Sequence, residues 1–225
     1  MNSSARTKNT LHPPARQATT AWPLDPFLGR ASALKVGMWI FLVSDAFSFG
    51  GLLLAYGVLR AGAAVWWPAD EPAFGVGFTA FLTFVLICSS VTMKMAVDAA
   101  HAGQRQLVAR YLGLTIAGGL LFLVGQAHEY FGLGGHGLLA RGLTLGHSAR
   151  ATTFYVITSF HGLHVATGVI VLLVVLARAA LGWRGGVNAD IVETAGLFWH
   201  FVDLIWILVF TFVYLLPARP GMEGG

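Results

Sequence analysis

The chain has 225 residues, of which 56% are hydrophobic and 11% are charged. About a quarter of the residues of an ordinary soluble domain are charged, so this composition excludes that class and predicts a membrane protein. The formal net charge of +4 comes from basic residues dispersed at the ends of apolar runs. Basic residues at the ends of apolar runs are typical of the topology of a membrane protein. They therefore argue against a nucleic-acid-binding patch.

Cys88 is the single cysteine and lies within an apolar run. An internal disulfide is therefore impossible, and the thiol is predicted to be a small buried side chain. The N-terminus lacks an apolar core followed by a small-residue cleavage site, so we expect no cleaved signal peptide.

Three regions follow from composition. Residues 1–33 are rich in Ala, Thr and Pro and are predicted to form a cytosolic, mostly disordered tail. Residues 34–217 are predicted to form one transmembrane domain, and residues 218–225 a short C-terminal tail. The domain contains five apolar runs, each longer than the roughly 20 residues that a bilayer-spanning helix needs. They are about 35–59, 74–97, 111–133, 153–177 and 191–216. The fold class is therefore predicted to be all-α, a polytopic five-helix membrane bundle.

Lysines and arginines predict the orientation, because basic residues favour the cytoplasmic side. With the N-terminus inside, ten of them lie inside and four outside, which favours an N-inside, C-outside chain. The inner set is Arg6, Lys8, Arg16, Arg30, Lys35, Lys94, Arg105, Arg110, Arg178 and Arg184, and the outer set is Arg60, Arg141, Arg150 and Arg219.

The last apolar run carries an ionisable pair, His200 and Asp203, three residues apart and so on one helix face. Trp199 and Trp206 flank Asp203 at i−4 and i+3. An Asp at mid-bilayer costs about 2.5–3.5 kcal/mol on insertion scales, so its side chain must face protein or water. We therefore expect a buried contact between helices here.

Other runs also carry polar side chains at bilayer depth: Asp45 in the first, Gln126 and Glu129 in the third, and His161 and His164 in the fourth. Counted from the inner ends, Asp45 and Asp203 lie at about 15 and about 18 Å, and Glu129 and His161 at about 25 Å. This predicts two layers, Asp45 with His200 and Asp203, and Glu129 with His161. Small residues spaced for close helix packing occur at Ala46-x-x-x-Gly50, Gly118-Gly119 and Gly162-x-x-x-Ala166.

Three interpretations of these polar residues remain open. Their types suit haem or di-iron ligation, but the repeated Glu-x-x-His of a di-iron bundle does not occur. Intramembrane carboxylates often mark proton paths, which makes Asp45, Glu129 and Asp203 candidates for a relay. The favoured interpretation is that the groups satisfy one another, fix the packing of the helices and contact a partner subunit. Nucleophile elbows, phosphate loops and His-Glu-x-x-His are absent from the sequence, so no catalytic residue is predicted.

Several stretches, taken together and in order, resemble subunit III of haem–copper terminal oxidases, the cytochrome c oxidase polypeptide III family. They are GMWIFLVSD at 37–45, SSVT at 89–92, GQAHEY at 125–130, TFY at 153–155, FHGLHV at 160–165 and WHFVDLIW at 199–206. Two features depart from the family pattern. Asp45 stands where the family often has the longer Glu, and the chain resembles a short form with five helices instead of seven.

The resemblance implies a redox-inert subunit of a proton-translocating cytochrome c oxidase in the inner (plasma) membrane. It implies that haem and copper belong to subunits I and II, and that this chain binds phospholipid, supports the catalytic subunit and sustains proton uptake. No cofactor or metal is expected in the chain itself. In this view Asp45, Gln126, Glu129, His161, His164, His200 and Asp203 make buried or subunit contacts.

Other functions remain possible on the sequence. Subunit III of a quinol oxidase, or an accessory subunit of nitric oxide reductase, would have much the same sequence, because other subunits bind the electron donor. A stand-alone haem-binding electron carrier and a small transporter are the alternatives from different classes.

Overall fold

The computed structural model describes residues 33–64, 66, 74–132, 137–180 and 188–216. The tails predicted at 1–33 and 218–225 lie outside the described residues, apart from Ala33. Within the described part, the helices are α1 (Ala33–Gly62), α2 (Val76–His101), α3 (Arg105–Phe131), α4 (Ala149–Ala180) and α5 (Ala189–Val209). A π-helix, η1 (Phe210–Leu215), continues α5. Five helices are long and apolar enough to cross a membrane, which confirms the all-α, five-span fold.

The helices extend beyond some of the apolar runs. The largest difference is at α3, which begins at Arg105 instead of 111, and α4 begins at Ala149 instead of 153. An apolar run marks the part of a helix that lies in hydrocarbon, whereas the helix itself continues into the interface. Long Arg side chains are tolerated there because they reach toward water.

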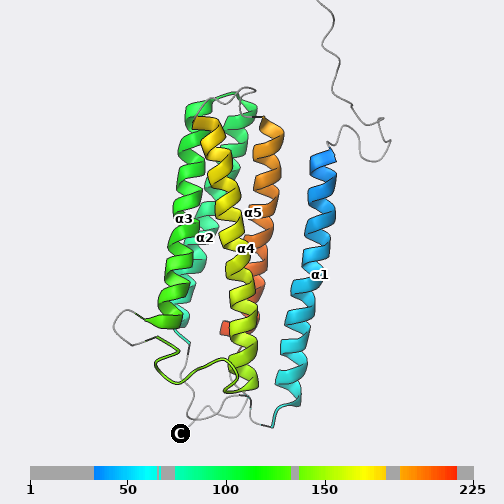
Figure 1. Cartoon of the computed structure of the whole chain (residues 1–225), viewed down its shortest axis with the longest axis vertical. Coiled ribbons are helices and arrows are strands. Elements are labelled where there is room, and N and C mark those ends of the chain that lie inside the picture. Colours follow the sequence, from blue (N-terminus) through cyan, green and yellow to red (C-terminus); the bar gives the residue numbers. More distant parts are fainter. Residues whose placement is uncertain (1–32, 65, 67–73, 133–136, 181–187, 217–225) are drawn as a thin grey trace, which may run out of the picture.

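The helices form a bundle in which α1 lies at one edge, against α4 and α5 (Figure 1). Helices α2 to α5 pack more closely, and glycines allow that approach. A Cβ on Gly119 would lie 2.5 Å from Trp199, and one on Gly118 would lie 2.8 Å from the Cβ of Ser89. The Gly118-Gly119 pair is therefore a true packing site between α3 and its neighbours.

Two packing expectations are wrong. Ala46 and Gly50 are both exposed on α1, and a Cβ on Gly50 would meet no atom within 4 Å. Cys88 is likewise exposed and not buried. Both errors have one cause: a helix in lipid is apolar on every side, so composition does not reveal which face meets protein.

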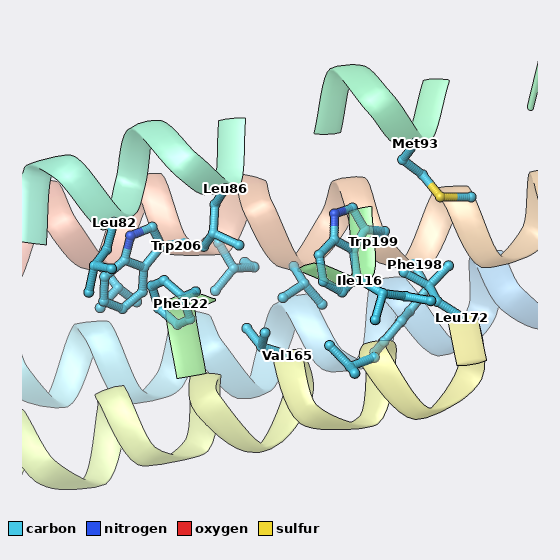
Figure 2. Packing of buried hydrophobic residues seen from close by; sticks show 14 of the residues in the cluster. Leu82, Leu86, Met93, Ile116, Phe122, Val165, Leu172, Phe198, Trp199 and Trp206 are labelled. Atoms are coloured by element: carbon cyan, nitrogen blue, oxygen red, sulfur yellow. The ribbon is translucent and has the colours of Figure 1, made fainter. Parts of the chain in front are cut away.

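Aromatic rings fill the centre of the bundle. Trp206 packs edge-on against Phe122, with ring centroids 4.7 Å apart, beside Leu82 and Leu86 of α2 (Figure 2). Two turns along α5, Trp199 occupies a second layer with Ile116 (Figure 2). All of these side chains are at most 5% exposed. They hold α5 at the centre of the bundle and so position its polar residues.

Candidate functional site: the polar groups within the bundle

A polar seam joins α5 to α2. Trp199 Nε1 donates a hydrogen bond to Ser89 Oγ at 3.1 Å, and Trp206 Nε1 donates one to Thr83 Oγ1 at 2.9 Å. Both indole nitrogens are directed toward α2 (Figure 2). A buried Trp needs a partner for its N–H, and small hydroxyl residues supply one without separating the helices.

Within the part of the chain that the structure describes, His200 and Asp203 lie on the same seam but do not pair with each other. His200 Nδ1 lies 2.6 Å from Ser90 Oγ, and the imidazole is half-buried. Asp203 is 5% exposed, and neither carboxyl oxygen has a hydrogen-bond partner within the described part of the chain. The acid therefore lies beside two indoles whose N–H groups are already committed to other oxygens.

Asp45 of α1 contacts His164 of α4. His164 Nε2 lies 3.2 Å from Asp45 Oδ1, and both side chains are largely buried. His164 Nδ1 lies 2.8 Å from the carbonyl oxygen of Phe160. This contact joins the edge helix α1 to the bundle at bilayer depth.

This contact lowers the cost of placing an acid in the membrane. The carboxyl of Asp45 and the imidazole of His164 each gain a polar neighbour that lipid cannot supply.

His161 lies one turn from His164 and is fully buried. Its ring packs against Trp206 at 4.7 Å and edge-on against Phe122 at 5.6 Å. Phe49 of α1 covers the same region, 4.8 Å from Phe160 and 5.1 Å from the His164 ring. Neither nitrogen of His161 has a hydrogen-bond partner among the described residues.

Gln126, Tyr130 and Thr158 form a hydrogen-bonded cluster between α3 and α4. Gln126 Nε2 donates to the Thr158 carbonyl at 2.7 Å and to Tyr130 Oη at 3.0 Å. Tyr130 Oη and Thr158 Oγ1 are 2.5 Å apart. A Cβ on Gly162 would lie 2.6 Å from Gln126 Oε1, so the glycine is what admits the amide. The cluster fixes the packing of α3 on α4.

Glu129 faces α2 and the π-helix. Tyr214 Oη donates to Glu129 Oε2 at 3.0 Å, and Thr79 Oγ1 donates to Oε1 at 3.4 Å. A π-turn contains an extra residue relative to an α-turn and so changes which side chains face inward. Here the π-helix η1 contains Tyr214, whose buried side chain is directed at the Glu129 carboxyl.

A further ionic contact joins α1 to α5 at the other end of the bundle. Lys35 Nζ lies 2.8 Å from Glu193 Oε2 and 3.0 Å from Asp190 Oδ1. His101 Nε2 of α2 lies 3.4 Å from the same Glu193 oxygen. The acids of this cluster were missed in the sequence analysis because they lie at a helix start, where acids also stabilise the helix dipole.

The two expected layers do not match the contacts. Asp45 contacts His164, not His200 or Asp203, and Glu129 contacts Tyr214 and Thr79, not His161. The depth of a residue in the membrane does not determine the direction in which its side chain leaves the helix. At the depth of Asp45, α1 lies against α4. The hydroxyl partners Thr83, Ser90 and Thr158 were also missed, since Ser and Thr are common in membrane helices and carry no distinguishing signal.

The polar residues are thus spread over separate interhelical contacts. Among the described residues, no group of three or more His, Cys, Asp or Glu is arranged to hold a metal ion. His161 and His164, whose spacing suggested a ligand pair, have different surroundings: an aromatic pocket and an aspartate. The arrangement can hold helices together and can carry protons at individual sites.

Comparison with known proteins identifies the family of the chain. A family model described as cytochrome c oxidase subunit III matches residues 28–217. The probable cytochrome c oxidase subunit 3 of Mycobacterium tuberculosis (strain ATCC 25618 / H37Rv) is 34% identical over 189 residues, which cover 84% of this chain and 91% of that protein. The cytochrome c oxidase subunit 3 of Corynebacterium diphtheriae is 35% identical over 191 residues, with the same coverage. That of Synechocystis is 37% identical over 189 residues, covering 84% of this chain and 78% of the relative.

The fold and the dispersed polar contacts define a multi-pass helical membrane protein whose intramembrane acids and imidazoles mainly face other helices. With the matches in sequence, the chain belongs to the cytochrome c oxidase subunit III family. It is a subunit III of a haem–copper oxidase and works within a complex of oxidase subunits.

Proposed function

We propose that this chain is the redox-inert subunit III of a proton-translocating cytochrome c oxidase that reduces O2 to water. The relatives named above are cytochrome c oxidase subunits, which supports cytochrome c as the electron donor of this complex. The observation that carries the redox-inert role is the separation of the Asp45–His164 pair, His161 and Asp203 into three different surroundings. Subunits I and II are the proposed partners, and they hold the haem and copper.

The test of this role is a complex purified with and without the chain. We expect the complex lacking it to keep its haem spectrum and its initial turnover rate, and to lose activity sooner during sustained turnover. Loss of haem or copper in proportion to the missing chain would contradict a redox-inert role. If quinol but not cytochrome c reduces the complex, its electron donor is quinol and not cytochrome c. If the complex consumes NO and not O2, its substrate is NO.

The orientation is also proposed. The inner (plasma) membrane of a bacterium is the proposed location, with the N-terminus inside and the C-terminus outside. This places the Lys35, Asp190 and Glu193 cluster at the cytoplasmic end and the Glu129–Tyr214 contact toward the outer end. A cysteine introduced beside Gly225, with Cys88 replaced by Ala, is expected to react with an impermeant maleimide in intact spheroplasts. Reaction in inverted vesicles instead would reverse the topology.

Phospholipid is the proposed ligand of the chain. A groove of about 510 Å³ lies between α1 and α4, lined by Ser48, Leu52, Val156, Ser159, Phe160 and Leu163. The lining is mainly apolar with two hydroxyls, which suits an acyl chain. Leu163→Trp is expected to lower the lipid that co-purifies with the complex, measured by mass spectrometry. Val124→Trp, at an exposed position on α3, is the matched control and should leave it unchanged.

A further inference from the structure

The lateral surfaces of α3 and α4 are mainly apolar, as expected of helices that meet lipid. At positions 114–124 of α3, every exposed side chain is apolar. At positions 156–174 of α4, the exposed polar side chains are Ser159 and Thr167. The Thr167 hydroxyl donates to the Leu163 carbonyl at 2.9 Å, so it needs no partner from outside its own helix. Both faces therefore suit hydrocarbon.

The face that α2 and α5 form together carries a half-buried imidazole near the middle of the bilayer. His200 Nδ1 lies 2.6 Å from Ser90 Oγ. Ser90 lies 11 residues before His101, where α2 ends, and His200 lies 11 residues after Ala189, where α5 begins. Both are thus about 17 Å from the same end of the bundle. The 26 residues of α2 are about 39 Å long, so this depth is close to mid-bilayer.

One ring nitrogen of His200 needs a partner from outside the chain. Nδ1 is bonded to Ser90, and the described residues supply no hydrogen-bond partner for Nε2. His164 of α4 differs, because its Nδ1 lies against the Phe160 carbonyl and its Nε2 against Asp45. A polar nitrogen that meets only hydrocarbon costs several kcal/mol. The position of His200 therefore predicts a polar group on whatever covers it.

The same face also carries an exposed ion pair. Lys94 and Asp98 follow Ser90 at i+4 and i+8, so they lie on its side of α2. They pair with each other, with side chains 64% and 61% exposed. Because one charge balances the other, this face suits a partner with hydrogen-bonding side chains and not one of opposite charge. The apolar side chains of Val91 and Leu204 are exposed beside these polar groups and supply packing area.

We propose that the α2–α5 face, formed by Ser90, Val91, Lys94, His200 and Leu204, is where another membrane subunit of the same oxidase docks. The docked element is a transmembrane helix with a hydroxyl, amide or carboxyl side chain that hydrogen-bonds His200 Nε2. Acyl chains cannot supply that bond, and lipid head groups lie about 15 Å from mid-bilayer. The occupant is taken from the oxidase complex, so the inference rests on the proposed function and adds the surface and its chemistry.

Photo-crosslinking in the membrane-embedded complex tests the surface. A benzophenone amino acid is placed at Val91 or Leu204, which are 57% and 58% exposed. The matched controls are Leu114 of α3 and Val174 of α4, which are 56% and 54% exposed. We expect Val91 and Leu204 to cross-link to another oxidase subunit, identified by mass spectrometry, and the controls to give lipid adducts. Lipid adducts alone at Val91 and Leu204, a product of two copies of this chain, or equal yields at all four positions would overturn the proposal.

The same experiment separates this inference from the proposed function. If oxidase subunits co-purify with the chain but cross-link through Leu114 or Val174, the α2–α5 face is wrong and the proposed function stands. If no subunit with haem or copper co-purifies, the proposed function fails and the inference fails with it.

The role of His200 is tested by how firmly the chain stays on the complex. His200→Leu is expected to raise the dissociation constant of the chain about three- to tenfold, as loss of one interhelical hydrogen bond in a membrane would. His200→Gln keeps a hydrogen-bonding group and should recover much of that loss. Thr167→Val is the matched control, because that exposed hydroxyl bonds its own helix. Equal dissociation of His200→Leu and Thr167→Val, or equal losses in His200→Leu and His200→Gln, would contradict the hydrogen bond.

Discussion

At the scale of single residues, hydrogen-bond direction decides how each intramembrane polar group is tolerated. Asp45 is tolerated because His164 lies against it, with Nε2 3.2 Å from Oδ1, while His164 Nδ1 lies 2.8 Å from the Phe160 carbonyl oxygen. Gln126 is accepted because Gly162 leaves space for its amide. These are local solutions to one problem, since an unpaired polar group in hydrocarbon costs several kcal/mol.

The Asp45–His164 pair makes a prediction about charge. In Asp45→Asn the amide N–H can donate to a neutral His164, so we expect a loss of stability of at most about 1 kcal/mol. In Asp45→Leu the His164 Nε2 loses its partner, and a cost of about 1–3 kcal/mol is expected. Thermal unfolding of the purified complex, followed by tryptophan fluorescence, measures both. Equal destabilisation by Asn and Leu would show that the pair needs a charge on the acid.

Gly162 makes a prediction about space. Gly162→Ala places a Cβ 2.6 Å from Gln126 Oε1 and forces the amide away from the Thr158 carbonyl. We expect destabilisation of about 1–3 kcal/mol from overpacking. Gly57→Ala is the control, because a Cβ there meets nothing within 4 Å. It should be neutral or stabilising by about 0.5–1 kcal/mol, since helical Gly is less favourable than Ala. Similar unfolding temperatures for the two variants would contradict the packing of Gln126.

At the scale of elements, α5 with its π-helical end organises the bundle, and α1 is attached at its edge. The seam of α5 with α2 uses two indoles and three hydroxyl residues, whereas α1 is joined by the Asp45–His164 pair, the Lys35 ion pairs and the Phe49 ring. Much of the α1 surface is exposed and apolar, with Ile40, Phe47 and Leu54 each more than 65% exposed. In the membrane this surface meets lipid or another subunit.

The π-helix makes a prediction about the Glu129 contact. Tyr214→Phe keeps the ring among its aromatic neighbours and removes the hydrogen bond to Glu129. We expect a loss of about 1–3 kcal/mol, because the half-buried Glu129 loses a donor. Deletion of Phe212, an exposed residue of η1, removes the extra residue of the π-turn and turns Tyr214 away from Glu129.

The two variants are compared with Phe212→Leu, which keeps the chain length. We expect the deletion to destabilise the complex at least as much as Tyr214→Phe, and Phe212→Leu to leave its unfolding temperature nearly unchanged. A deletion variant as stable as Phe212→Leu would mean that the π-turn does not place Tyr214.

At the scale of the whole molecule, the sequence predicts the helices well and their partners poorly. Runs of about 20 or more apolar residues identify the five spans, since few other structures satisfy the backbone in lipid. The neighbours of Asp45 and Glu129 could not be predicted, because depth along a helix leaves rotation and helix order undetermined. The resemblance through six stretches taken together did identify the family. WHFVDLIW at 199–206 is one of its most specific parts, since an acid between tryptophans in a membrane helix is costly and therefore distinctive.

The central claim is that this bundle is a redox-inert part of a larger oxidase, and purification of the tagged chain in mild detergent tests it most directly. We expect subunits that carry haem and copper to co-purify with it, and the chain separated from them to show no visible haem band and no bound iron or copper. A monodisperse chain, free of other subunits and holding iron or copper at stoichiometric levels, would contradict the claim.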